Sequence, residues 1–124
     1  MSRVGFLSEF SFEVYIRTND GGNIPHVHIW DTGTKGKRFN SCVKLTSPEY
    51  FPHGGKYKDT FSSKQKDAFV EFMKEVRTFS NKRVPAMTNY EYCCFLWNEN
   101  NSNVSVEVQY DENDNPIIPD YSQL

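Results

Sequence analysis

Two segments of alternating apolar and polar residues, joined by a glycine-containing turn, constrain the fold more than any other feature. Residues 10–17 carry an apolar side chain at every second position: Phe10, Phe12, Val14 and Ile16. This period is typical of a strand with one buried face. The Asn-Asp-Gly-Gly sequence at 19–22 suits a tight turn, because Asn and Gly tolerate positive φ. A second strand is predicted at 24–30, with Pro25 at its start because proline cannot donate to a ladder. The two strands predict a β-hairpin.

Two helices are predicted in the second half of the chain. Ser62 and Gln65 have the spacing of a capping box. Apolar side chains follow at helical spacing: Phe69, Phe72, Met73, Val76 and Phe79. They predict an amphipathic helix of about five turns. Thr88 and Glu91 repeat the capping signature and predict a second helix over Asn89–Asn100.

Three further strands are predicted, and together these elements define the fold class. The strands cover residues 38–45, 49–53 and 104–108, and in the first of them Phe39, Ser41, Val43 and Leu45 share one face. We expect an α+β fold: an antiparallel sheet of three to five strands with two helices packed on one face. Residues 1–110 would form this single domain, and residues 111–124 an acidic, proline-containing C-terminal tail.

Composition agrees with a small domain in a reducing compartment. The 124 residues include 10 Phe, 7 Tyr and 2 Trp, which can bury a core although only 37% of residues are hydrophobic. No apolar run has the length of a membrane span, and residues 1–10 lack a signal-peptide core. Cys42, Cys93 and Cys94 make a poor disulfide framework, being odd in number with two adjacent. We therefore expect a soluble, cytoplasmic protein without membrane contact, with its thiols buried.

Charge is distributed unevenly along the chain. Residues 1–83 hold all 14 basic residues and 9 acidic ones, a net +5, whereas residues 84–124 hold 7 acidic residues and no basic one, a net −7. Either the acidic part folds back on the basic part, or it faces a basic partner. For the second case the expected protein-binding residues are Glu107, Asp111, Glu112, Asp114 and Asp120.

The sequence Pro-His-Val-His-Ile-Trp at 25–30 carries the candidate chemistry. On a strand, His26, His28 and Trp30 share a face, and two imidazoles so placed can chelate a divalent metal. His53 is the expected third ligand, with Asp31 and Asp59 as alternatives. Such a site would leave a position for water, as hydrolytic metals do. The alternative is a pair of surface histidines on an exposed strand face.

A basic segment indicates a different kind of partner. Lys35, Lys37, Arg38 and Lys44 surround Phe39. Clustered Lys and Arg with an aromatic residue are typical of nucleic-acid surfaces. The pI near 5.9 and the lack of a known binding motif argue against this function.

The Pro-His-hydrophobic-His pattern at 24–30 resembles a set of small bacterial and phage proteins known mainly as a domain of unknown function. Some of their genes lie beside toxin–antitoxin genes. The similarity extends loosely to residues 37–45, to the helix that contains Phe69–Val76, and to Trp97-Asn98. The resemblance implies a compact α+β module from bacteria or their mobile elements, and it transfers no catalytic residues.

Three hypotheses follow for the function. The first is a non-catalytic protein-binding module, in one version an inhibitor whose acidic segment occupies the basic nucleic-acid channel of a host defence complex. The second is a metal-dependent hydrolase or nuclease that uses His26 and His28, and the third is an antitoxin-like nucleic-acid-binding protein. No catalytic residue is assigned, and a divalent metal is the only cofactor considered.

Overall fold

The computed structural model describes residues 2–18, 23–33, 39–52, 55–81, 83–102 and 104–124, and its centre is a four-stranded antiparallel sheet. In spatial order the strands are β1 (Ser2–Leu7), β2 (Phe12–Ile16), β3 (His26–Asp31) and β4 (Asn40–Lys44). Two helices contribute side chains to the core that forms against this sheet. The predicted α+β fold is therefore confirmed. The predicted turn at 19–22 lies outside the described residues.

The predicted hairpin is formed by β2 and β3. Val14 pairs with Ile29, and Tyr15 pairs with His28. Because paired residues point to the same face of a sheet, the pleat gives this hairpin one apolar face and one face that carries Tyr15 and His28. β4 pairs with the other edge of β3, so the three strands predicted from alternation at 10–17, 24–30 and 38–45 are neighbours.

The edge strand β1 has no counterpart among the sequence predictions. Its pairing register with β2 shifts between Arg3 and Gly5, and a bulge of this kind breaks the period-two pattern that alternation detects. Gly5 also lies against the first helix, since a Cβ atom at this position would be 2.9 Å from Cε2 of Phe72. Glycine therefore allows the strand and the helix to approach this closely.

Helix α1 (Ser63–Lys74) begins where its capping box predicts. The Ser62 hydroxyl accepts a hydrogen bond from the Gln65 backbone N–H, and the Gln65 side chain accepts one from the Ser62 N–H. The helix ends earlier than predicted, because the backbone is extended at Glu75.

The residues after α1 form a second, two-stranded sheet. Strand β5 (Val76–Arg77) pairs antiparallel with β6 (Met87–Thr88). Val76, predicted on the apolar stripe of the helix, is 61% exposed. The prediction of about five turns is wrong at this end, because inter-strand hydrogen bonds replace helical ones after Glu75.

Helix α2 (Asn89–Asn100) has the predicted bounds. Thr88 Oγ1 accepts from the Glu91 backbone N–H, and the Glu91 carboxylate accepts from the Thr88 N–H at 2.9 Å. Its buried side chains include Cys93 and Cys94, as the sequence predicts for the thiols, and also Trp97.

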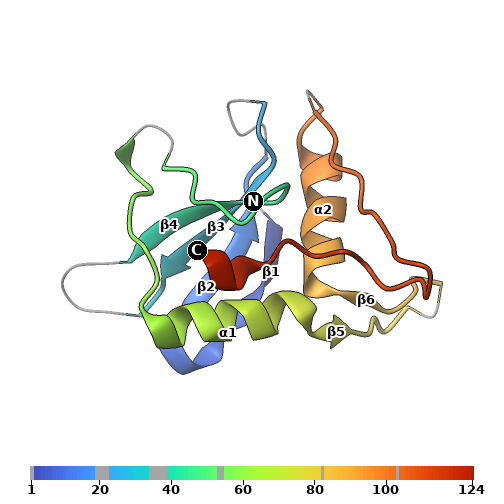
Figure 1. Ribbon diagram of the computed structural model, residues 1–124, viewed down its shortest axis with the longest axis horizontal. Helices are drawn as coiled ribbons and strands as arrows, with labels where there is room; N and C mark the ends of the chain where they lie inside the picture. Colours follow the sequence, from blue (N-terminus) through green and yellow to red (C-terminus); the bar gives the residue numbers. More distant parts are fainter. Residues whose placement is uncertain (1, 19–22, 34–38, 53–54, 82, 103) are drawn as a thin grey trace.

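The two helices take different positions around the sheet. In Figure 1, α1 crosses in front of the sheet, and α2 stands beside it next to β1. The C-terminal segment descends along α2, turns back and ends between α1 and the sheet. There Tyr121 is 1% exposed and its hydroxyl donates to the Lys44 carbonyl at 2.7 Å. The last residues of the chain thus take part in the packing.

Two strand predictions need correction. The segment at 49–53 contributes only an isolated bridge between Tyr50 and Val43 within its described part. No strand forms among the described residues of 104–108; Val106 instead exchanges hydrogen bonds with the side chain of Asn98, at 2.8 Å each. The Asn98 side-chain amide on α2 thus supplies the hydrogen bonds that a neighbouring strand would otherwise provide.

Candidate metal centre

The structure brings His26 and His28 together with a cysteine. Alternation along β3 places both imidazoles on one face, and the pairing of β3 with β4 sets Cys42 directly opposite His28. One ligand atom from each of the three side chains lies within 4.8 Å of the other two. We refer to His26, His28 and Cys42 as the His-His-Cys cluster. Among the described residues it is the group whose arrangement fits a metal ion.

The spacing within the cluster is close to that of a coordinated ion. Cys42 Sγ is 3.2 Å from Nδ1 and 3.6 Å from Nε2 of His28. Around a tetrahedral zinc ion, bond lengths of about 2.0–2.1 Å to nitrogen and 2.3 Å to sulfur separate a nitrogen and a sulfur ligand by about 3.6 Å. The distances between Cys42 and His28 therefore match those of two ligands on one ion, and the ligand atom of His26 lies within 4.8 Å of both.

A hydrogen bond orients the His26 ring. Its Nδ1 lies 2.7 Å from the backbone carbonyl oxygen of Ile24. Since a carbonyl can only accept, Nδ1 donates this hydrogen bond, and Nε2 is the nitrogen that could ligate a metal. Metal-bound histidines commonly have such a partner, which fixes both the tautomer and the ring orientation.

Aromatic rings pack around the cluster. Tyr15 stacks on His28 with ring centroids 5.1 Å apart, and the Tyr57 ring meets His28 edge-on at 4.7 Å. Phe51 and Trp97 lie 5.0 and 5.1 Å from the His26 ring. Burial, and next the nearby Tyr57, raise the pKa of Tyr15 to about 12, so Tyr15 is a neutral phenol at pH 7.

The cluster is closed to solvent. His26, His28 and Cys42 each have 0% of their surface exposed. The alternative interpretation, two surface histidines on an exposed strand face, is therefore wrong. The loss of solvent access follows from the aromatic packing, which alternation within a single strand could not reveal.

The other predicted metal ligands are placed elsewhere or are not described. Asp31 lies on the opposite face of β3 from the histidines by alternation, and its Oδ1 accepts from the Gly33 N–H at 3.0 Å. Asp59 accepts from the Asn40 N–H at 2.8 Å. His53 lies outside the described residues.

Cys42 is the member of the cluster that the sequence analysis missed as a ligand. The predicted strand at 38–45 had already placed Phe39, Ser41, Val43 and Leu45 on one face, which left Cys42 on the other. The missing information was the register between the two strands, because a shift of one residue would turn Cys42 away from the histidines.

The predicted acidic protein-binding residues all lie at the surface. Glu107, Asp111, Glu112, Asp114 and Asp120 are exposed. Two of them also hold local turns: Asp111 accepts from the N–H groups of Asn113 and Asn115, and Asp120 accepts from that of Ser122. The bonds from Asn115 and Asn113 lower the pKa of the Asp111 carboxyl group. The pKa of Asp120 is lowered first by a hydrogen bond from the Ser122 hydroxyl and further by the one from the Ser122 N–H.

Most residues of the predicted nucleic-acid surface are not described by the structure. Lys35, Lys37 and Arg38 lie outside the described residues. Lys44 is half-buried and forms an ion pair with Glu49 at 3.5 Å. By register it lies opposite His26, at the edge of the His-His-Cys cluster.

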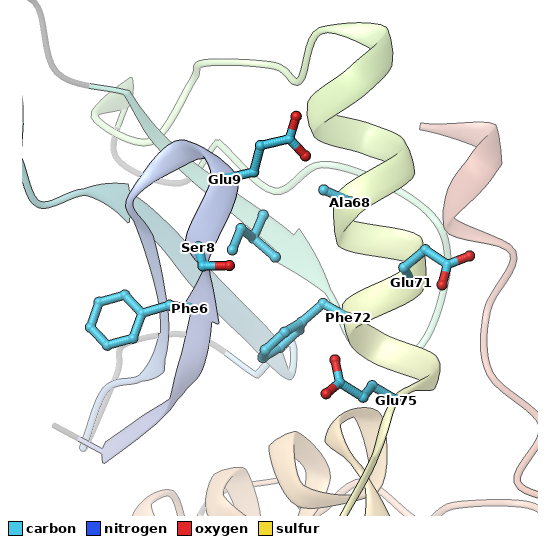
Figure 2. Close-up of a pocket in the computed structure, with 8 residues that line it drawn as sticks. Phe6, Ser8, Glu9, Ala68, Glu71, Phe72 and Glu75 are labelled. Carbon is cyan, nitrogen blue, oxygen red and sulfur yellow. The ribbon is translucent and has the colours of Figure 1, made fainter.

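A second feature, which the sequence analysis did not single out, is an acidic groove between β1 and α1. Figure 2 shows Glu9 on one side and Glu71 and Glu75 on the other, with the Phe72 ring between them. The groove encloses about 280 Å³. Its three carboxylates are exposed, so the groove shows net negative charge to solvent.

Comparisons with family models, with curated proteins and with solved structures give no match for this chain. The resemblance to small bacterial and phage proteins thus stays a prediction. No helix within the described part of the chain has the length and apolar character to cross a membrane.

Proposed function

We propose that this chain is a metal-binding module in which one ion, held by the His-His-Cys cluster, fastens β3 to β4. The observation that carries the proposal is the convergence of three metal-ligating atoms within 4.8 Å in a buried position. Two imidazoles and a thiolate are ligands that zinc and copper accept readily.

The proposed role of the ion is structural rather than hydrolytic. A hydrolytic metal needs a coordination position that water and substrate can reach. The three ligating residues are fully buried, and aromatic rings pack on both imidazoles. An ion in this position would instead cross-link two strands and stabilise the folded state by its binding free energy.

Metal analysis of tag-free protein tests the proposal. Wild type should contain about one ion per chain after equilibration with zinc or copper and removal of excess metal. Binding should disappear in His26→Ala/His28→Ala and in Cys42→Ala. Cys93→Ala is the matched control, because Cys93 is also a fully buried cysteine but lies on α2 outside the cluster. Equal metal content in the wild type and the double variant would refute the proposal.

A second candidate function is protein binding through the acidic C-terminal segment. It is favoured by the exposure of five carboxylates at Glu107, Asp111, Glu112, Asp114 and Asp120 and by two exposed apolar side chains among them, Tyr110 (50%) and Ile117 (56%). Charge together with apolar contact area suits a basic protein surface. A channel that normally holds nucleic acid, as in a host defence complex, has this chemistry.

The test of this second function compares captured partners. Glu107→Gln/Glu112→Gln/Asp114→Asn removes three charges and leaves Asp111 and Asp120, which hold local turns, in place. A partner retained by the wild type at near-physiological salt and lost by this variant would support the function. Identical capture by both proteins would contradict it.

A further inference from the structure

The ligands of the His-His-Cys cluster and their surroundings indicate which metal ion binds there. This inference rests on the proposed metal-binding function. The relevant observations are the number and softness of the ligands and the charge of their surroundings. Both can be compared with what zinc and copper require.

The cluster offers three ligands, one of them soft. Structural zinc sites are almost always closed by four protein ligands in a tetrahedron. Thiolates favour monovalent copper, and a trigonal set of two histidines and one cysteine is typical of copper proteins. The His-His-Cys cluster supplies this trigonal set from two adjacent strands.

The net charge of the complex also favours a monovalent ion over a divalent one. Two neutral imidazoles and one thiolate contribute a charge of −1, so a monovalent ion gives a neutral complex and a divalent ion leaves one positive charge. Burying an uncompensated charge is costly.

The carboxylates of Glu13 and Glu49, which lie near the cluster, are each paired with a cation. Arg17 donates to the Tyr57 hydroxyl at 2.6 Å, and Lys44 lies opposite His26 in the sheet, so two cations approach this face. Glu13, on the same face of β2, accepts from Arg3 at 3.2 Å, and Glu49 pairs with Lys44. Of the Glu13 carboxylate only Oε2 is paired, because Oε1 is buried without a hydrogen-bond partner.

We infer that the His-His-Cys cluster is a site for monovalent copper, coordinated by Nε2 of His26, an imidazole nitrogen of His28 and Sγ of Cys42. Binding replaces the thiol proton with the ion: the Cys42 S–H bond breaks, a Cu–S bond forms, and one proton is released to the buffer. No change of oxidation state is involved.

The test is an anaerobic competition between monovalent copper and Zn²⁺ on the full chain. Tag-free wild type is first loaded with zinc and then titrated with cuprous ion buffered by a chelator of known affinity. We expect about one copper per chain to displace zinc, with at least about tenfold tighter binding than zinc and release of one proton relative to the apoprotein. Because Trp97 lies 5.1 Å from the His26 ring, its fluorescence should change as copper binds.

Variants show whether the ion occupies this cluster. Cys42→Ala should bind copper at least about 100-fold more weakly, whereas Cys93→Ala should bind it like the wild type. Circular dichroism on each apoprotein shows whether it is folded, and His28→Ala serves as the second cluster variant if Cys42→Ala is unfolded. Equal copper affinity in folded Cys42→Ala and wild type would overturn the assignment.

The result separates this inference from the proposed function. Stoichiometric zinc that cuprous ion fails to displace would refute the copper assignment and leave the metal-binding proposal intact. Failure of both ions to bind would refute both.

Discussion

Replacing Gly5 with alanine should destabilise the protein through a contact that the structure defines. A Cβ atom at residue 5 would lie 2.9 Å from Cε2 and 3.0 Å from Cζ of Phe72. Ordinary carbon–carbon contacts are about 3.5–4.0 Å. The Phe72 ring, which is only 8% exposed, must therefore move by at least about 0.6 Å, or β1 must move away from α1.

Two opposing effects set the magnitude. Forcing an extra methyl group into a packed contact costs about 1–3 kcal/mol. Replacing glycine by alanine returns about 0.4–1 kcal/mol, because the unfolded chain loses conformational freedom. The difference is a loss of about 0–2.6 kcal/mol in the free energy of unfolding, with a central value of about 1.3 kcal/mol. The acidic groove beside Phe72 gives the ring some space to move, which favours the lower half of this range.

Urea unfolding, followed by circular dichroism and by tryptophan fluorescence, measures the effect. Gly33→Ala is the matched control, because its Cβ atom would meet only the Ser11 side chain, at ordinary distances of 3.7 Å to Cβ and 4.0 Å to Oγ. The control should be unchanged or more stable. In a Phe72→Leu background, which lacks the two ring carbons, the cost of Gly5→Ala should shrink. A Gly5→Ala protein as stable as the control, or an unchanged cost in the Phe72→Leu background, would refute the reasoning.

Two further predictions concern α2 and the C-terminus. Burial raises the pKa of Glu91, but hydrogen bonds from Tyr110 and Thr88 outweigh this effect and lower it below 4.5. The charged carboxylate therefore stabilises the fold above pH 4.5, and this contribution is lost as the pH falls through the lower folded-state pKa. Glu91→Gln should flatten this part of the acid-unfolding profile. A profile identical to that of the wild type would contradict the assignment. Tyr121→Phe removes the hydrogen bond to the Lys44 carbonyl and should cost about 0.5–1.5 kcal/mol in urea unfolding. No loss of stability would show that the C-terminal segment does not depend on this bond.

Most local structure follows from the sequence because it depends on neighbouring residues. Alternation from Phe12 to Ile16 and from His26 to Trp30 reflects the pleat of a strand, and the capping boxes at Ser62 and Thr88 supply hydrogen bonds within three residues. The α+β class, the two strands of the hairpin and both helix starts can be predicted from such short-range patterns. The sequence also indicated the two histidines as a pair on one face.

Only the tertiary structure decided the features that depend on distant contacts. β1 is a strand because it pairs with β2 despite its bulge. α1 ends at Lys74, and the residues after Glu75 pair with β6 instead of continuing the helix. The candidate metal centre needs the register between β3 and β4, which brings Cys42 to His28 across 14 positions of the chain. Burial of the cluster requires rings from four separate segments. A sequence can indicate which side chains share a face of one strand, but register and packing determine which ligands meet and whether water reaches them.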